Sequence, residues 1–448
     1  MSAGVGAVRR LAIRPLDWVE PLAVAAGLAH REGALCLLSD GGPHGRYSHV
    51  ACDPVTVEVG PADPADPFGP LRRAGADRLA VGLLSYDAGA RAATGAREAA
   101  AGDWPDLMLA LYPAMLVFDH RTRTLSAVSR AGDAAAAEAG LDRAEGWAAG
   151  ARAIPAPPPL ADAFPPEESG EAYEAAVADV VARIGAGELF QANLARGWSG
   201  ALRPGADPFE VFVRLARGAA PYGAFWRLGD RALVSNSPEL FLTFDPASRR
   251  IETRPIKGTR ARDPDPVIDA RRAAELVASE KDRAENLMIV DLMRNDLARV
   301  SRPGSVAVEQ LFALESFATV HHLVSTVTAE AREGIGTADL LAATFPPGSI
   351  TGAPKHQAMK VIAGHEPPRG PWCGSLMLMD ADGRLTASVL IRTLSFWREG
   401  EGWAFRTLAG AGITAGSDPA EERAETEAKI AAVREALIGN PSYKDILI

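Results

Sequence analysis

The sequence predicts an α+β fold in which most of the sheet is antiparallel. Two observations support this prediction. Short β-forming runs crowd the first 130 residues, whereas the long helical stretches come later in the chain. In addition, strands and helices do not alternate in the regular order that a parallel sheet with crossover helices requires.

The first 130 residues are predicted to be largely sheet. Four apolar runs are separated there by turn-forming residues: ALCLLS at 34–39, VTVEV at 55–59, LAVGLLSY at 79–86 and AMLVFD at 114–119. Such spacing is typical of strands joined by short connections. We therefore expect a β-rich N-terminal region over residues 1–130.

Residues 131–166 are the best candidate for a boundary. An alanine-rich, helix-forming stretch leads there into the segment IPAPPPLADAFPP. Successive prolines cannot donate backbone hydrogen bonds and they force an extended backbone. We therefore expect a linker over 131–166, followed by a second, larger domain over 167–440.

Downstream of this linker, a helix is predicted over residues 169–185. Ser169 is a suitable N-cap, and acidic residues fill the first turn, where they interact favourably with the helix dipole. The runs at 232–245 and 249–260 suggest a hairpin-like pair of strands. A long helix is expected next, from about residue 269 to residue 300.

The last third of the chain is predicted to be strands and loops with one closing helix. Strand-forming runs occupy residues 375–380, 385–397 and 403–414. The closing helix is expected from about residue 419 to residue 437.

Charge and cysteine usage narrow the class of protein. The chain has 448 residues, a formal charge of −10 and a pI near 5.4. This acidic balance argues against a general nucleic-acid or anionic-membrane binder, because both need a cationic surface. The three cysteines are scattered and lack metal-ligand spacing, which favours reduced, buried thiols in a cytoplasmic protein. No run approaches 18 apolar residues, so no transmembrane segment is expected.

Two acidic stretches are candidates for a metal site. Asp282 and Glu285 are three residues apart on a predicted helix, and Glu422 and Glu425 repeat this spacing on the closing helix. Residues at this spacing share one helix face, and carboxylates suit Mg²⁺, a hard ion that takes oxygen ligands. Spacing alone does not distinguish this site from two solvated surface helices carrying salt bridges.

Lys257, in the run TRPIKGTRAR, is a candidate nucleophile. Burial and the nearby Arg254, Arg260 and Arg262 would both lower the pKa of its amine, which nucleophilic attack requires. From composition alone, however, a basic patch that attracts anions is the simpler interpretation.

Other polar residues have two interpretations each. Arg392 interrupts an apolar run, so it needs either a bound carboxylate or a buried acidic partner. His321 and His322 point to opposite faces of a strand, so at most one lines a site, and a core histidine is the simpler interpretation for either. Three Gly-rich turns, at 345–355, 372–377 and 408–418, could offer backbone amides to a carboxylate or could simply be tight turns.

Read together, these segments resemble the chorismate-utilising enzymes. The resemblance is continuous from about residue 170 to residue 437, and several motifs occur in the order that the family has. The motifs are SPELF, TRPIKGTR, EKDRAENLMIVDLMRNDL, VHHLVSTV, FPPGSITGAPK, IRTL and GAGITAGSDP followed by AEERAETEAK. Residues 1–150 match only loosely.

The resemblance implies a fold and a substrate pocket. Members of the family pack two large, mostly antiparallel sheets as a sandwich with helices outside, and they bind chorismate with Mg²⁺ on its ring carboxylate. It implies Glu285 and Glu425 as metal ligands, supported by Asp282 and Glu422. It also implies the following substrate-binding residues: Gly258, Thr259, His322, Arg392, and Gly410, Ala411 and Gly412, whose turn would offer its amides.

The resemblance also implies catalytic roles for Glu239 and Lys257. Glu239 would protonate the departing C4 hydroxyl, which needs a pKa raised by burial. Lysine in PIKGT is typical of the aminodeoxychorismate synthase component I subfamily, whereas anthranilate synthase component I usually has alanine there. In the lysine version, the amine is thought to attack C2 before ammonia adds at C4.

The function implied is a transferase-type amination of chorismate at C4, giving 4-amino-4-deoxychorismate for 4-aminobenzoate and folate synthesis. Ammonia would come from a glutamine amidotransferase partner. Isochorismate-forming relatives tend to carry a lysine base in the region of Gln191 to activate water, and the absence of a basic residue there favours amination. Anthranilate synthase component I is the alternative enzyme, and a catalytically retired subunit that senses an aromatic ligand is the non-enzyme alternative. One departure is Met377-Leu378, where members often have Gly-Tyr, so Leu378 lacks a hydroxyl that could contact substrate.

Overall fold

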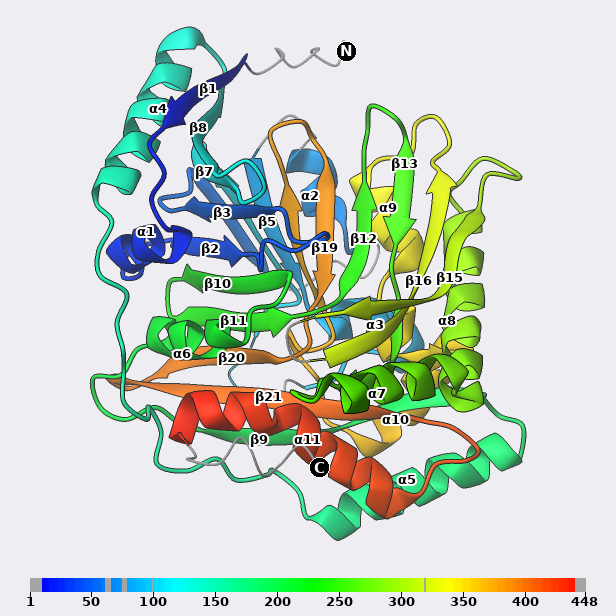
Figure 1. Cartoon of the computed structure of the whole chain (residues 1–448). Helices are drawn as coiled ribbons and strands as arrows, with labels where there is room; N and C mark the ends of the chain where they lie inside the picture. The colour runs from blue at the N-terminus through cyan, green and yellow to red at the C-terminus, as the bar shows by residue number, and fades with distance from the viewer. Residues whose placement is uncertain are drawn as a thin grey trace.

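Two large antiparallel sheets dominate the structure, a computed structural model (Figure 1). The structure describes residues 10–60, 66–74, 79–98, 100, 102, 104–317 and 320–439. The predicted α+β fold, with two sheets packed as a sandwich and helices outside, is confirmed.

Sheet A has eleven strands among the described residues. In spatial order these are β1 (Arg10–Leu16), β8 (Thr124–Ala131), β7 (Ala114–Asp119), β3 (Tyr47–Ala51), β2 (Leu35–Leu38), β10 (Tyr222–Leu228), β11 (Arg231–Ser237), β20 (Thr393–Glu399), β21 (Gly402–Ile413), β9 (Gln191–Ala201) and β17 (Gly352–Ala353).

Sheet B has ten strands in the same part of the chain. Its order is β14 (Ile256–Ala261), β16 (Val320–Glu330), β13 (Arg250–Thr253), β12 (Leu240–Phe244), β19 (Leu385–Val389), β18 (Ser375–Met379), β5 (Leu79–Leu84), β6 (Leu107–Tyr112) and β4 (Thr56–Gly60), and β15 (Ala307–Ser316) also pairs with β16.

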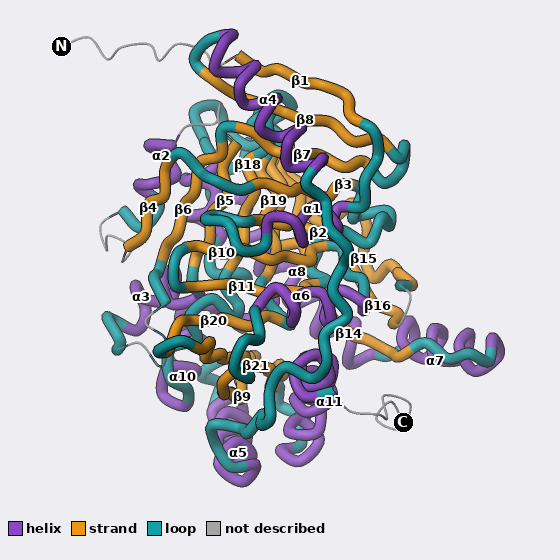
Figure 2. The backbone as a smooth tube through the Cα atoms, turned by 90° about the vertical axis from the view of Figure 1, so that its left-hand side faces the viewer, coloured by secondary structure: helices purple, strands orange, loops and turns teal. Residues whose placement is uncertain are grey.

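The helices lie on the outside of the two sheets. Helix α4 runs across β1, β8 and β7 (Figure 2), and α8 stands beside β15 and β16 (Figure 1). The described helices are α1 (Pro21–Leu28), α2 (Gly69–Ala74), α3 (Tyr86–Thr94), α4 (Ala134–Ala149), α5 (Gly170–Gly185), α6 (Pro208–Leu215), α7 (Pro266–Ala278), α8 (Glu280–Ala298), α9 (Thr337–Thr344), α10 (Lys355–His365) and α11 (Pro419–Ile438), with 3₁₀ turns at Ala216–Gly218 and Gly348–Ile350.

Apolar side chains from both sheets meet in the core. Phe241 of β12, Met377 of β18 and Leu408 of β21 belong to one buried cluster, so this cluster joins sheet B to sheet A. Burying such side chains is the main favourable contribution to folding. Met377 and Leu378 are both buried here, as expected for core residues of a strand.

Several local predictions are confirmed. Helix α5 spans Gly170–Gly185, and the Ser169 side chain accepts a hydrogen bond from the amide of Ala172. The closing helix α11 and the predicted strands of the N-terminal region are also present. All three cysteines are free and buried.

The predicted long helix over 269–300 is wrong in one respect, because the chain forms two helices there. Helix α7 ends at Ala278 and α8 begins at Glu280. Between them, Ser279 has an extended backbone (ψ 109°), and its side chain accepts a hydrogen bond from the amide of Asp282 at 3.2 Å. A serine in this conformation caps a new helix and does not continue the old one.

The predicted hairpin also needs correction. Each of the two runs contains two strands: β11 and β12 in the first, β13 and β14 in the second. Only β12 and β13 pair as the expected hairpin. Because β11 belongs to sheet A and β12 to sheet B, the chain crosses between the sheets at Pro238 and Glu239.

The segments on either side of residues 131–166 contribute strands to both sheets. β2 pairs with β10 in sheet A, and β5 pairs with β18 in sheet B. The expected linker contains α4 and an extended stretch that leads to α5. In space, therefore, the N-terminal region and the second domain share two continuous sheets.

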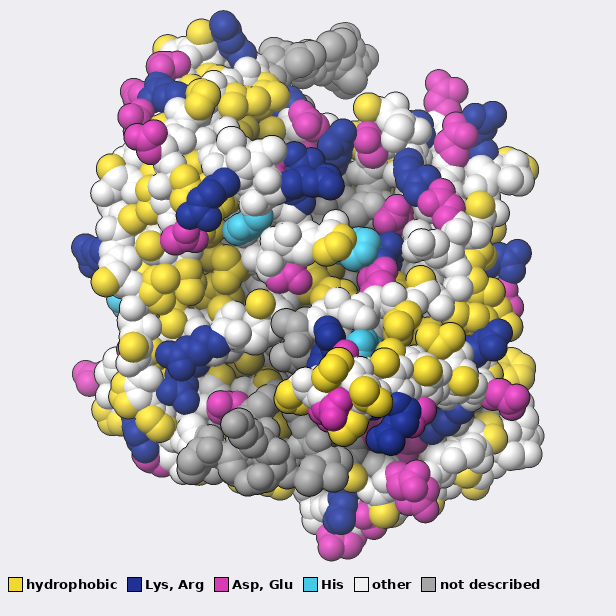
Figure 3. Space-filling view, in the orientation of Figure 1, with side chains coloured by type: hydrophobic (Ala, Val, Ile, Leu, Met, Phe, Trp, Pro, Cys, Tyr) yellow, Lys and Arg dark blue, Asp and Glu magenta, His cyan; other side chains and the backbone are white. Residues whose placement is uncertain are grey.

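The surface visible in Figure 3 has no continuous field of one charge. Lys and Arg side chains are interspersed there with Asp and Glu. In the part of the chain that the structure describes, no helix is both long enough and apolar enough to cross a membrane.

Candidate active site

The candidate site lies where β14 of sheet B faces β21 and β9 of sheet A. A β-carbon on Gly412 would lie 3.4 Å from Nζ of Lys257 and 2.2 Å from Nε2 of Gln191. Glycine on β21 therefore lets side chains from two other strands approach its backbone. The predicted nucleophile and the predicted glycines thus lie side by side, although they are distant in the sequence.

Glu239 is buried at the point where the chain crosses between the sheets. Burial raises the pKa of its carboxyl, while a hydrogen bond from the Ser349 side chain, the charge of Lys257 and a hydrogen bond from the backbone of Ile256 partly oppose this. Its Oε1 atom has no hydrogen-bond partner. The direction of this pKa shift is the one that a general acid needs near neutral pH.

Lys257, on β14, is surrounded by charged side chains. Burial is the largest influence, and it lowers the pKa of the amine. The charge of Glu285 opposes this shift and that of Lys429 reinforces it, while Glu239 and Glu425 also favour the protonated amine. The net direction favours a neutral, nucleophilic amine.

The basic patch that the sequence suggested around Lys257 does not form. Each of the three neighbouring arginines instead has a carboxylate partner: Arg254 bonds Glu315, Arg260 bonds Asp282, and Arg262 bonds Asp269. Their charges are therefore largely compensated, and they are not among the main influences on the pKa of Lys257.

The predicted metal-binding carboxylates come from α8 and α11. Burial raises the pKa of Glu285, and the negative charges of Asp282 and Glu425 add to the shift. Burial likewise raises the pKa of Glu422, again with a contribution from Glu425. These mutual influences mean that the two acidic helices approach one another at the site.

Two of these carboxylates already have cationic partners. Asp282 accepts a hydrogen bond from Arg260 at 3.0 Å, and Glu425 accepts one from Lys429 at 2.6 Å. Burial opposes ionisation of Glu425, but the charge of Lys429 and its hydrogen bond outweigh it and lower the pKa. Glu285 has no ion pair among the described residues.

The donor chemistry fits Mg²⁺, although the described residues include no group of three or more His, Cys, Asp or Glu side chains set to hold a metal ion. Mg²⁺ usually keeps several waters and takes only one or two carboxylates from the protein. Glu422 is buried and Glu285 half-buried, and neighbouring negative charges add to the raised pKa of each, so a divalent cation would relieve that repulsion.

His321 and His322 are adjacent on β16, so their side chains point to opposite faces of the sheet and have different partners. Both ring nitrogens of His321 have partners, Ser316 at 2.7 Å and Asp269 at 3.0 Å, so His321 is a satisfied core histidine. His322 bonds Thr259 at 2.8 Å through Nδ1, and its buried Nε2 has no partner. Burial, then the charge of Arg392, lowers the pKa of His322 to about 4, so the ring is neutral near pH 7.

The expected Gly410–Gly412 turn is wrong, because these residues belong to β21. Strand β20 pairs with β21 only as far as Thr407, and beyond that point β21 pairs with β9 alone. One edge of this stretch therefore has no strand partner in the described residues. The carbonyl of Gly410 accepts a hydrogen bond from Nζ of Lys429 at 2.8 Å.

Gly258 and Arg392 have unusual backbones. Gly258 has φ +83°, and a β-carbon there would lie 2.9 Å from the side chain of Asp282. Arg392, between β19 and β20, has φ 51°. Such conformations are costly for residues other than glycine and are often found at functional sites.

Five buried polar atoms without a hydrogen-bond partner mark the same region. They are Gln191 Oε1, Asn193 Oδ1, Glu239 Oε1, His322 Nε2 and Trp372 Nε1. A β-carbon on Gly410 would lie 2.7 Å from Oδ1 of Asn193 and 3.0 Å from the Trp372 ring. Buried polar groups are normally satisfied, so this cluster indicates a site that binds a polar ligand.

The sequence analysis assigned no site role to four of the residues found here: Asn193, Ser349, Trp372 and Lys429. Asn193 could have been found, since it follows Gln191 by two residues on one strand and so faces the same side. Lys429 lies one helical turn after Glu425. Ser349 and Trp372 belong to Gly-rich segments that had been considered only for their backbone amides.

Comparison with known proteins agrees with this geometry. The profile of the family described as chorismate binding enzyme matches residues 54–435. Among solved structures, anthranilate synthase component I from Streptococcus pneumoniae TIGR4 superposes with a TM-score of 0.74 and 26% identity, covering 87% of this chain and 92% of that one. The chain belongs to the chorismate binding enzyme family and is a chorismate-utilising enzyme.

Within the family, two kinds of relative are similar to the chain. Aminodeoxychorismate synthase component 1 of Klebsiella aerogenes is 42% identical over 354 residues, which cover 78% of this chain and 75% of the relative. Anthranilate synthase component 1 of Streptomyces coelicolor is 38% identical over 466 aligned positions, which cover 94% of this chain and 88% of the relative.

Proposed function

We propose that this chain is the chorismate-aminating component of an aminodeoxychorismate synthase, which replaces the C4 hydroxyl of chorismate by an amino group. The observation that carries the proposal is the half-buried Lys257 side chain, with its amine beside Glu239 and next to Gly412. Burial of the amine lowers its pKa, and its position between the sheets suits a role as a nucleophile.

The reaction proceeds in two displacements. The lone pair of Lys257 forms a bond to C2, both conjugated double bonds of the ring shift by one position, and the C4–O bond breaks as Glu239 donates its proton, so that water leaves. Ammonia then bonds to C4, both double bonds shift back, and the C2–N bond to Lys257 breaks. Glu239, now a carboxylate, accepts the proton that the incoming ammonia loses.

The carboxylates of the substrate meet two groups of residues. Glu285 and Glu425, supported by Asp282 and Glu422, would hold Mg²⁺, and the chemistry that the ion supplies when bound is neutralisation of the ring carboxylate. Arg392 and the backbone of Gly410, Ala411 and Gly412 bind carboxylate oxygens. Gly258 and Thr259 line the pocket, and His322, as a neutral ring, faces the substrate ring.

We infer that a glutamine amidotransferase partner supplies the ammonia, and that the product enters 4-aminobenzoate and folate synthesis. The similarity to component 1 of aminodeoxychorismate synthase supports this inference. The three buried, free cysteines support a reducing, cytoplasmic setting.

Anthranilate synthase component I remains the second candidate function. It is favoured by the Streptomyces coelicolor relative, whose similarity extends over 94% of this chain. A retired, ligand-sensing subunit is less well supported, because Glu239, Glu285 and Glu425 all lie close enough to influence the ionisation of Lys257.

The two enzyme functions differ in their products. We expect purified protein with chorismate, Mg²⁺ and ammonium chloride to form 4-amino-4-deoxychorismate, identified by chromatography and mass spectrometry, without release of pyruvate. Fluorescent anthranilate and pyruvate would instead establish the second candidate.

Lys257→Ala tests the covalent step separately. We expect this variant to lose C4 amination at least about 1,000-fold, since a nucleophile without a substitute is removed. Circular dichroism and thermal unfolding of the variant, compared with the wild type, control for damage to β14. If Lys257→Ala kept full C4 amination with ammonia, the covalent role would be wrong while the family assignment would stand.

A further inference from the structure

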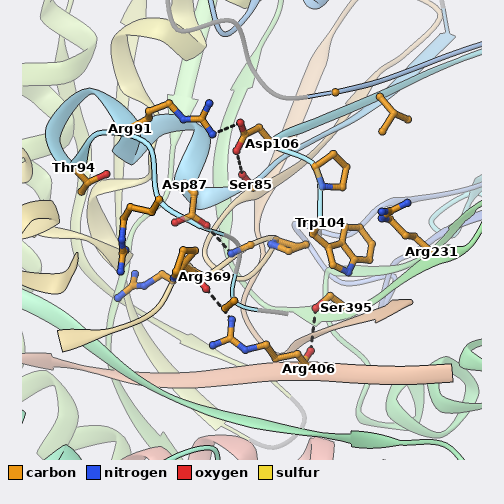
Figure 4. A pocket seen from close by; sticks show the side chains of 18 of the residues that line it. Ser85, Asp87, Arg91, Thr94, Trp104, Asp106, Arg231, Arg369, Ser395 and Arg406 are labelled. Carbon is orange, nitrogen blue, oxygen red and sulfur yellow. Dashed lines mark hydrogen bonds and ion pairs between the residues drawn. The ribbon is translucent and has the colours of Figure 1, made fainter. Parts of the chain in front are cut away.

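A cavity that Lys257 does not line lies between residues of the two sheets, and Figure 4 shows side chains that line it. Its volume is about 450 Å³, which is within the range of small-molecule sites. It is bordered by the end of β4, by α3, by residues 368–371 and by side chains of β20 and β21. None of the residues proposed above to bind chorismate or Mg²⁺ lines it.

A layer of stacked side chains separates this cavity from the candidate active site. The guanidinium of Arg369 lines the cavity and lies 4.4 Å from the ring centroid of Tyr86 and 5.1 Å from that of Trp372. Trp372 in turn contacts Gly410 on the side of the active site. Arg369 and Trp372 therefore stand between the cavity and Gly410 of the candidate active site.

The cavity is rich in arginine, but most of the charge is compensated. Four of its five arginines have carboxylate partners, namely Arg91 with Asp106, Arg231 with Asp230, Arg369 with Glu366, and Arg406 with Glu167. Because each of these four arginines is already paired with a carboxylate, the pairs make the walls polar but leave no net positive charge to attract an anion.

Arg97 is the exception. Its guanidinium donates to the backbone carbonyls of Ala363, at 3.2 Å, and Glu366, and no carboxylate among the described residues forms an ion pair with it. Both of these bonds use one nitrogen, so the rest of the fork retains N–H groups that can be donated to a ligand.

Trp104 supplies a second available donor. Its indole ring forms one wall of the cavity, and its buried Nε1 has no hydrogen-bond partner (Figure 4). A buried donor without an acceptor is costly, so the site is incomplete without an acceptor from a ligand. The rings of Pro105 and Pro371 add apolar surface to the same cavity.

We propose that this cavity binds a small carboxylate with an apolar body, of the size of an aromatic carboxylic acid. The carboxylate oxygens accept hydrogen bonds from Arg97 and from Nε1 of Trp104, and the apolar body packs against Pro105 and Pro371. This site is separate from the one that carries the proposed function and does not depend on it.

The position of the cavity connects its occupancy to the active site. Asp87, in its wall, accepts a hydrogen bond from the amide of Gly370 at 2.7 Å. The neighbouring Arg369 donates to the carbonyl of Asn193 at 2.6 Å and to that of Ile350 at 3.1 Å. A ligand that displaces residues 368–371 would therefore also displace Arg369, whose hydrogen bonds position Asn193 and the loop that contains Ser349.

Titration calorimetry with sodium benzoate as the probe tests the proposal. We expect one benzoate per chain with a Kd that rises about tenfold in Trp104→Phe, which keeps an aromatic ring at this position but removes the pyrrole part of the indole with its N–H donor, and rises similarly in Arg97→Gln. Lys257→Ala, which alters the active site alone, is the matched control and should leave this Kd unchanged. Thermal unfolding of each variant verifies that it is folded.

Three results would overturn the proposal. They are no benzoate binding to the wild-type chain at 10 mM, binding that is lost in Lys257→Ala but kept in Trp104→Phe and Arg97→Gln, and inorganic phosphate binding as tightly as benzoate. The last result would show an anion site without selectivity for an apolar body. Because Trp104→Phe and Arg97→Gln test the site separately, the outcome does not depend on whether Arg97→Gln folds.

Discussion

At the scale of single residues, burial prepares the two groups that the proposed reaction uses. It raises the pKa of Glu239 and lowers that of Lys257, so each group is shifted toward its neutral form. Each shift moves its group toward the form that the proposed reaction needs, which is a protonated acid and an unprotonated amine. Opposite pKa shifts in neighbouring groups are a common property of acid–base sites.

The pH dependence of kcat/KM should be bell-shaped. Activity should rise with pH as Lys257 loses its proton, and fall at higher pH as Glu239 loses the proton that it must donate. In Glu239→Gln, we expect a rate at least about 100-fold lower, with the alkaline fall removed. An alkaline fall that persists in this variant would assign that ionisation to another group.

The same carboxyl should reduce stability at high pH. Because the folded-state pKa of Glu239 is raised above its unfolded value, its contribution to stability is complete at low pH and is lost as the pH rises through the folded-state pKa. We therefore expect Glu239→Gln to melt at a higher temperature than the wild type at pH 8, by about 2–4 °C for each kcal/mol, and to show no such gain at low pH. Thermal scans at the two pH values measure this difference.

At the scale of elements, the start of α8 connects helix capping to the metal site. Ser279 caps this helix, and its first two turns carry Asp282 and Glu285. Ser169 caps α5 by the same kind of bond, at the same distance of 3.2 Å, but α5 carries none of the proposed ligands. The two serines therefore form a matched pair for an experiment.

We expect Ser279→Ala and Ser169→Ala each to lower the free energy of unfolding by about 1 kcal/mol. Only Ser279→Ala should also raise the Mg²⁺ concentration needed for half-maximal activity, because fraying of α8 displaces Asp282 and Glu285. Denaturant titration and activity against Mg²⁺ concentration give the two values. Equal Mg²⁺ requirements in the two variants would argue against a metal site on α8.

Strand β21 and the turn that follows it offer a second matched pair. Alanine at Gly412 would place a β-carbon 2.2 Å from Nε2 of Gln191 and 3.4 Å from Nζ of Lys257, whereas a β-carbon at Gly416 meets no atom within 4 Å. We expect Gly412→Ala to lower kcat/KM at least tenfold, or about 1.4 kcal/mol of transition-state binding, and Gly416→Ala to leave it unchanged. Steady-state kinetics with chorismate decide between these outcomes.

At the scale of the whole molecule, the sheets unite the two halves of the chain. Sheet A joins them where β2 pairs with β10, and sheet B where β5 pairs with β18. A fragment that starts at residue 167 would lose strands from both sheets and expose their paired edges and apolar faces. We expect it to remain unfolded, with no cooperative thermal transition by circular dichroism, and a fragment that unfolds cooperatively would show that the second domain is independent.

Much of the site was predictable because its motifs are local. The helical spacing of Asp282 and Glu285 and the alternation of His321 and His322 follow from the repeats of helix and strand. The break at Ser279 was not apparent, because α7 and α8 are both strong helical patterns and a single cap decides where one ends. The ion pairs of Arg254, Arg260 and Arg262 were not predictable either, since their partners come from other elements.

The sequence by itself determined the α+β class, most of the helices and strands, and which residues bear the chemistry, because each depends on neighbours within a few positions. Only the tertiary structure decided that β11 and β12 lie in different sheets, that Glu239 is buried at their crossing, and that Lys257 meets Gly412. Those relations depend on strand order and register between distant segments, and burial, which shifts the pKa values, exists only once the sheets have packed.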